Sequence, residues 1–95
     1  MTEDERRQAW SACINSFGAN AQTDRAVEKL SDLISGLMRY KQSDSMVMVR
    51  EELATEIAAV KVMMGQLELI FDCEDDIQFL MDFETRRQLE EIKKG

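Results

Sequence analysis

Apolar residues recur every three or four positions along most of the chain, which is the spacing of an amphipathic helix. The first such stretch begins near Thr2, which has capping-box spacing to Glu5 and is followed by acids that suit the positive end of a helix dipole. Its apolar side chains keep helical spacing as far as Phe17, and Gly18 favours a helix end. The pattern therefore predicts a first helix from about residue 2 to residue 17.

Two longer helices are predicted in the middle of the chain. One covers about residues 21–41 and ends at a polar break, residues 42–45. The other covers about residues 47–71, and its main apolar stripe steps by three or four without a miss: Val49, Leu53, Ile57, Val60, Met64, Leu67 and Phe71. A helix apolar over so much of its girth packs on more than one neighbour. Gly65 lies inside it, where either a close approach of another helix or chance would explain the glycine.

The acidic segment 72–76 suits the start of a fourth helix, and Lys93 and Lys94 suit its end. Four helices with short connections predict an all-α, four-helix bundle in a single domain, residues 1–95. A chain of this length has a thin core. We therefore expect a homo-oligomer, a dimer or tetramer formed through the long central helices.

Composition narrows the range of functions. The chain has no proline and four glycines, so it has few of the turn residues that separate short strands. Its net charge of −7, from 19 acids and 12 bases, argues against direct nucleic-acid binding, because such binding needs a basic face. The acidity can reflect solubility, a metal site built from carboxylates, or a surface that competes with nucleic acid for a basic protein partner.

The lack of histidine removes several kinds of chemistry. With only the isolated thiols of Cys13 and Cys73, a zinc site of the usual kind is excluded, as is every serine–histidine or cysteine–histidine arrangement. The polar N-terminus is unlike a signal peptide, and no apolar run approaches the roughly 18–20 residues that span a membrane. We therefore expect a cytosolic protein with no membrane contact.

Two pairs of acids are the candidates for chemistry. Glu28 and Asp32 are four residues apart on the second predicted helix, and Glu52 and Glu56 are four apart on the third. If these helices are antiparallel neighbours, the four carboxylates can converge, as in helical bundles that bind hard cations such as magnesium. The alternative is that they are ordinary acids on solvated helix faces.

The two acidic stretches also resemble a known family. Residues 17–33, FGANAQTDRAVEKLSDL, are similar to the segment FGxxxQxDxAxEExxEL of small phage-type MazG-like nucleoside triphosphate pyrophosphohydrolases. Residues 51–71, EELATEIAAVKVMMGQLELIF, are similar to the family segment EEIADVxIMxxQLxxIF. The resemblance covers about residues 15–92. It implies a magnesium-dependent cleavage of nucleoside triphosphates to the monophosphate and pyrophosphate, in the cytosol of a bacterium or a phage-infected host.

The family's metal ligands, an ExxE and a downstream ExxD, are only partly kept. The resemblance places the first acid of ExxE at Lys29 and the second at Asp32. It places the glutamate of ExxD at Glu56 and the aspartate at Ala59, which has no ligand atom, so that Asp32 and Glu56 are the remnant of the catalytic site. The glutamate that often precedes ExxE is kept as Glu28.

These departures favour loss of the metal site. A lysine ammonium repels magnesium and competes for the remaining carboxylates. Lys29 could instead pair with Asp32 and Glu56. The alternative is a re-registered site made by Glu28, Asp32, Glu52 and Glu56, with Lys29 contacting phosphate. Arg86 and Arg87 are further candidate phosphate contacts, unless they form a solvated basic patch on the last helix.

Three functions follow from this pattern. The first is a degenerate, weakly active or inactive MazG-like protein that binds a nucleotide or a protein, such as a phage-derived inhibitor of a host defence nuclease, with no cofactor. The second is an active magnesium-dependent pyrophosphohydrolase. The third is a purely structural helical dimer.

Overall fold

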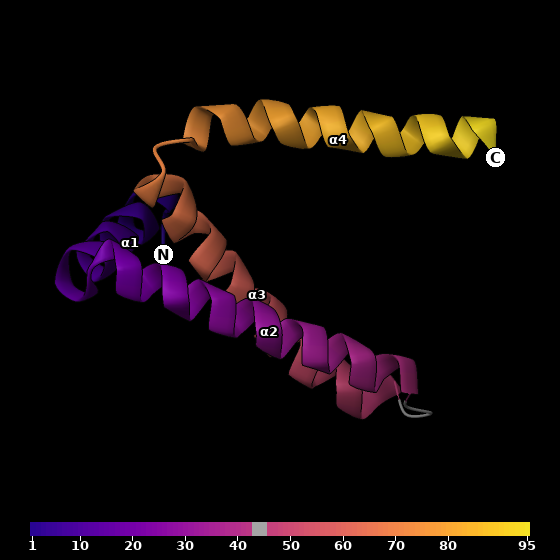
Figure 1. The fold of residues 1–95 in the computed structure, drawn as a ribbon, viewed down its shortest axis with the longest axis horizontal. Helices are drawn as coiled ribbons and strands as arrows, with labels where there is room; N and C mark the ends of the chain where they lie inside the picture. The colour runs from indigo at the N-terminus through magenta and orange to yellow at the C-terminus, as the bar shows by residue number, and fades with distance from the viewer. Residues whose placement is uncertain (43–45) are drawn as a thin grey trace.

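The computed structural model describes residues 1–42 and 46–95, which form four helices and no strand (Figure 1). The helices are α1 (Glu3–Phe17), α2 (Ala19–Gln42), α3 (Met46–Ile70) and α4 (Glu74–Lys94). The predicted all-α, four-helix fold is therefore confirmed. Of the predicted polar break, Gln42 is the last residue of α2, and residues 43–45 lie outside the described part of the chain.

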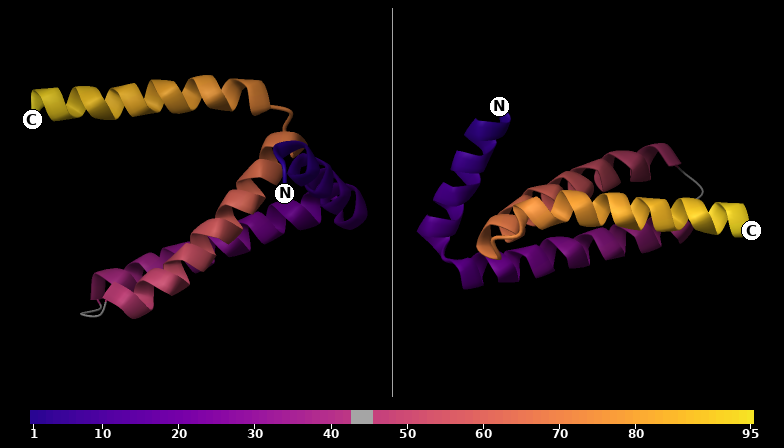
Figure 2. Two further views of the ribbon diagram at one scale, coloured as in Figure 1. Left: turned by 180° about the vertical axis from the view of Figure 1, so that it is seen from behind. Right: turned by 90° about the horizontal axis from the view of Figure 1, so that it is seen from above.

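Both predicted ends of the first helix are confirmed. The Glu5 backbone N–H donates to Thr2 Oγ1 and the Thr2 backbone N–H donates to Glu5 Oε1, each at 3.1 Å, so the capping box is complete. At the other end Gly18 has a φ of 95° and donates its N–H to the Ile14 carbonyl. Because one residue joins α1 to α2, the chain changes direction sharply there (Figure 2).

Helix α3 is the central element, since it contacts α1, α2 and α4. It runs beside α2 over most of its length, as the views in Figures 1 and 2 agree. The prediction that this helix packs on more than one neighbour is confirmed. Among the described residues, the buried apolar side chains are Ala26 on α2 and Met63 on α3, which is a thin core even for a small domain.

A buried amide pair joins α2 to α3 next to this core. Gln22 and Gln66 are 1% and 3% exposed, and Gln22 Nε2 donates to Gln66 Oε1 at 2.7 Å. The other amide oxygen, Gln22 Oε1, is buried with no hydrogen-bond partner. A shift of α2 against α3 would break the Gln22–Gln66 hydrogen bond and leave further buried amide atoms unpaired, which is costly. The bond therefore favours the observed pairing of the two helices.

Of the two explanations for Gly65, the structure supports a close approach, and the neighbour is Trp10 on α1. A Cβ atom built on Gly65 would lie 2.7 Å from Trp10 Cε3 and closer still to two other atoms of the indole ring. The glycine therefore allows the indole to lie directly against the α3 backbone, which anchors α1 on α3.

The corner between α3 and α4 depends on a residue that the sequence pattern did not single out. Asp72 has a φ of 51°, the left-handed conformation that usually selects glycine. The Cys73 N–H donates to the Glu68 carbonyl and the Asp72 N–H to the Leu69 carbonyl, which is the hydrogen-bond pattern of a Schellman cap. The chain thus turns sharply before α4 begins.

Helix α4 leaves the rest of the molecule after its first turns (Figure 1). Its start is held by the Arg7 guanidinium of α1, which donates through Nε and Nη2 to the two Glu74 carboxylate oxygens at 3.1 and 2.7 Å. This hydrogen-bonded pairing lowers the pKa of Glu74 from its ordinary value. No helix in the described part of the chain is both long enough and apolar enough to cross a membrane.

Candidate functional site

A charged cavity of about 380 Å³ lies between α2 and α3. Its lining residues are Lys29, Asp32, Ser35, Arg39, Thr55, Glu56 and Ala59. The four from α2 are three or four positions apart and so share one helix face. Of the three from α3, Ala59 is four positions from Thr55 and three from Glu56, so all three lie toward the same side of that helix. Antiparallel pairing of the two helices brings the two polar faces together at this point.

The cavity contains all four positions that the resemblance aligned with the metal ligands of ExxE and ExxD. Lys29 and Asp32 contribute from α2, and Glu56 and Ala59 from α3. Two acids that could accept a cation therefore share the cavity with a lysine and with an alanine methyl group.

Arg39 adds a second protein cation, which the sequence analysis missed. Its guanidinium nitrogen Nη2 donates to Glu56 Oε1 at 3.2 Å and forms a shorter contact with Glu52 Oε1. The helical spacing of Arg39 from Asp32, seven residues, was the signal that could have found it. Two of the four predicted carboxylates are thus bridged by one arginine.

Glu56 is the most enclosed acid of the cavity. Its side chain is 15% exposed, and its second carboxylate oxygen, Oε2, is buried with no hydrogen-bond partner. This carboxylate lies against Gly36 of α2, where an added Cβ would come within 2.9 Å of Glu56 Cδ and 3.1 Å of Leu53 Cδ2. A glycine at position 36 is therefore what allows the acid to reach between the helices.

The other predicted site residues lie elsewhere. Glu28 is exposed on α2 and does not line the cavity. Arg86 and Arg87 are exposed on α4, where Arg87 Nη1 pairs with Glu84 Oε2 of the same helix at 3.2 Å. Across residues 1–42 and 46–95 there is no group of three or more acids or cysteines placed to hold a metal ion.

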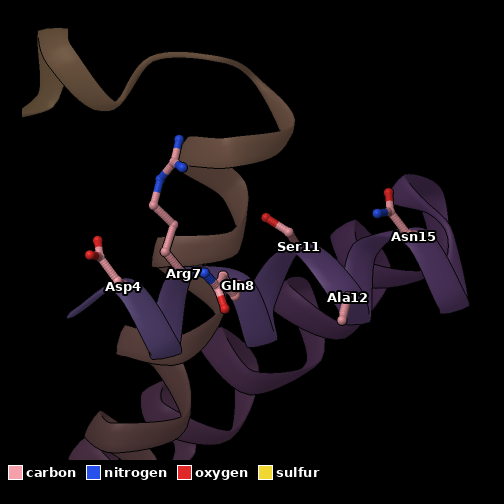
Figure 3. A pocket seen from close by; sticks show the side chains of 6 residues that line it. All are labelled: Asp4, Arg7, Gln8, Ser11, Ala12 and Asn15. Carbon is pink, nitrogen blue, oxygen red and sulfur yellow. The ribbon is translucent and has the colours of Figure 1, made fainter. Parts of the chain in front are cut away.

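A second polar hollow, of about 330 Å³, follows the outer side of α1 (Figure 3). Its lining residues are Asp4, Arg7, Gln8, Ser11, Ala12 and Asn15. All six come from one helix, and Figure 3 shows Arg7 pointing away from the others toward the start of α4. Because no second element contributes, we regard the α2–α3 cavity as the better candidate site.

No protein-family model, curated protein or solved structure matches the chain. The likeness to MazG-like proteins therefore remains a hypothesis that rests on the residues of this sequence.

Proposed function

We propose that this protein is a degenerate MazG-like domain that acts by binding a ligand rather than by catalysis, in a bacterial or phage-infected host cytosol. The observation that carries the proposal is the Arg39 guanidinium, which bridges Glu52 and Glu56. The fixed positive charge of Arg39 satisfies the same carboxylate oxygens that a magnesium ion would require.

The charge of the cavity supports the same proposal. Lys29 and Arg39 balance Asp32 and Glu56 within one set of lining residues. A divalent cation entering this cavity would meet the positive charges of the two protein cations that line it. As arranged, these residues do not fit a site for two magnesium ions, so we derive no catalytic step through a metal.

The first ligand to test is a nucleoside triphosphate. Lys29 is half-buried at the cavity wall, where an ammonium group can bind a phosphate oxygen without a metal. Arg39 can also supply donors to phosphate when it releases one of its acids. This mode of binding predicts that a triphosphate binds in the presence of a chelator.

Calorimetric titration with a nonhydrolysable triphosphate, in excess chelator, tests the proposal. We expect binding that weakens at least about tenfold, or about 1.4 kcal/mol, in Lys29→Gln. Lys61→Gln is the matched control, because Lys61 is exposed on α3 and lines a different hollow. Binding that requires magnesium and is lost in Glu56→Gln would refute a metal-independent binding site.

The alternative is an active magnesium-dependent pyrophosphohydrolase, and one observation favours it. Glu56 Oε2 is a buried acceptor with no partner, and Asp32 lines the same cavity. If Arg39 moved away, these two acids and Glu52 would be free to bind a magnesium ion. Pyrophosphate release that disappears in Glu56→Gln would support this function, and no turnover of the common triphosphates would exclude it.

A protein ligand is the second possibility for binding. The net charge of −7 suits a partner with a basic surface, and a host defence nuclease that binds nucleic acid has such a surface. This complex should weaken as salt is raised. A pull-down from host lysate that recovers no basic partner would count against it.

A further inference from the structure

A groove of about 520 Å³ lies between α3 and the first turns of α4, and it shares no lining residue with the charged cavity. Six of its lining side chains are apolar: Trp10, Met64, Leu67, Phe71, Ile77 and Met81. Helix α4 extends away from α3 at this corner (Figures 1 and 2), so Phe71 and Met81 remain 65% and 57% exposed. A concave apolar surface that stays open in this way is typical of a binding site.

The negative charge of the chain is concentrated at the same corner. Residues 68–84 contain seven acids and no lysine or arginine, and the net charge of the whole chain is −7. The seven are Glu68, Asp72, Glu74, Asp75, Asp76, Asp82 and Glu84. Within the described residues, only Glu74 and Glu84 of this set form ion pairs, with Arg7 and Arg87. Five acids beside an apolar groove are therefore available to a basic ligand.

The combination of an apolar groove and flanking acids indicates the kind of ligand. A helix with an apolar stripe and lysines or arginines beside it complements both features. Helices of this type bind by laying the stripe into a groove, and the flexible side chains of Met64 and Met81 suit such a contact. A second copy of the chain, bound groove to groove, would instead bring like charges together.

The exposed surface leaves room for a ligand of this size. The chain exposes 7701 Å², with a mass of 11.0 kDa. A compact monomer of that mass exposes about 5,600 Å², so the excess is about 2,000 Å². A standard protein interface covers about 800 Å² on each partner, which is well within this excess.

We propose that the groove between α3 and α4 binds a basic amphipathic helix of another protein. The apolar stripe of that helix lies against Leu67 and Phe71 of α3 and Met81 of α4, and its basic side chains reach the acids of residues 68–84. Such a helix would belong to the basic protein partner of the proposed function, on which this proposal rests. Nucleotide binding in the charged cavity is a separate property.

The probe is a synthetic peptide of about 18 residues, roughly 27 Å long as a helix, made of leucine and lysine with the leucines at amphipathic spacing. Trp10 is the only tryptophan of the chain and it lines the groove, so its fluorescence reports binding there. We expect a saturable shift of the emission to shorter wavelength, because the peptide removes water from the indole. The same peptide with glutamate in place of lysine should give no shift.

One pair of variants tests the apolar contact. Met81→Glu should weaken peptide binding at least about tenfold, because it puts a charge into the apolar groove. Phe79→Glu is the matched control, since Phe79 is an exposed apolar residue of the same helix that does not line the groove. Both variants gain an acid that attracts the peptide, so a loss only in Met81→Glu reports the groove. Circular dichroism verifies that both remain helical.

A second pair tests the charge. The double variant Glu68→Gln and Asp72→Asn should weaken binding about fivefold, because it removes two acids at the groove. Asp24→Asn with Glu28→Gln removes two exposed acids of α2 that do not line the groove, and it should change the affinity less than twofold.

Two results would overturn the proposal. One is an unchanged Trp10 emission at saturating peptide, as expected if a second copy of the chain already covers the groove. The other is calorimetric binding of the peptide that Met81→Glu and Phe79→Glu weaken equally, which would leave a basic partner bound elsewhere on the chain. Failure of the triphosphate titration, with peptide binding intact, would instead refute nucleotide binding in the charged cavity and leave the groove as proposed.

Discussion

Replacing Gly65 with alanine should destabilise the protein, although alanine is the better helix former. Gly65 lies in the interior of α3, and the indole ring of Trp10 lies against it. The new methyl group would lie 2.7 Å from Trp10 Cε3 and closer still to two other ring atoms. An indole is rigid, so the whole ring has to move.

Two opposing terms set the magnitude. Alanine gains about 1 kcal/mol over glycine from helix propensity. Forcing extra volume into an occupied contact costs typically about 1–3 kcal/mol. We therefore expect a net loss of about 1 kcal/mol in the free energy of unfolding, or roughly 4–8 °C in Tm for a domain of this size.

The test is a double-mutant cycle with Trp10→Ala. Once the indole is removed, the clash is gone and only the propensity term remains, so Gly65→Ala should then stabilise the protein by about 1 kcal/mol. Thermal unfolding followed by far-UV circular dichroism reports all four proteins. The protein concentration must be the same throughout, because the Tm of an oligomer depends on it.

The change of sign is what makes this cycle decisive. If Gly65→Ala stabilised the wild-type protein, the contact of α1 with α3 would not be as described. If it destabilised both backgrounds equally, the cost would come from some neighbour other than Trp10.

Three further substitutions test other contacts. Gln66→Leu should cost about 1–3 kcal/mol in chemical denaturation because it leaves the buried Gln22 amide without its partner, and adding Gln22→Leu should recover part of that loss. Asp72→Gly should raise the stability by up to about 1 kcal/mol, because glycine adopts the left-handed conformation without strain, and an unchanged Tm would argue against that cap. Because the hydrogen bonds from Arg7 lower the pKa of Glu74, the pair contributes its stability above the ordinary pKa of 4.5, and this contribution is lost as the pH falls below it. Glu74→Gln should therefore lower the stability at neutral pH more than at pH values well below 4.5, and an equal loss at both would contradict the ion pair.

Local signals along the sequence predicted the elements well. The Thr2–Glu5 capping box and Gly18 determine the ends of α1 through contacts within a few residues of each other. The left-handed conformation of Asp72 was not predicted, because this position lacks the glycine that usually adopts it. A residue other than glycine does not indicate by its type that it adopts this conformation.

Contacts between helices were harder to predict. The alignment with the family segments indicated that Lys29, Asp32 and Glu56 would lie close together, and all three line one cavity. The alignment did not identify Arg39, whose partners are on another helix. The direction of α4 was also beyond the pattern. An apolar stripe shows that a helix has a partner, but it does not show whether that partner belongs to the same chain.

We propose that Arg39 takes the place of a metal ion between Glu52 and Glu56, with which it forms ion pairs. Magnesium titration by calorimetry of the wild-type protein and of Arg39→Gln tests it most directly, with Arg50→Gln as a control that removes an exposed arginine from α3. We predict that Arg39→Gln binds magnesium at least about tenfold more tightly than the wild-type protein, because two carboxylates lose their competing cation, and that Arg50→Gln does not. Tight magnesium binding by the wild-type protein that Glu56→Gln abolishes, with no gain in Arg39→Gln, would contradict the claim.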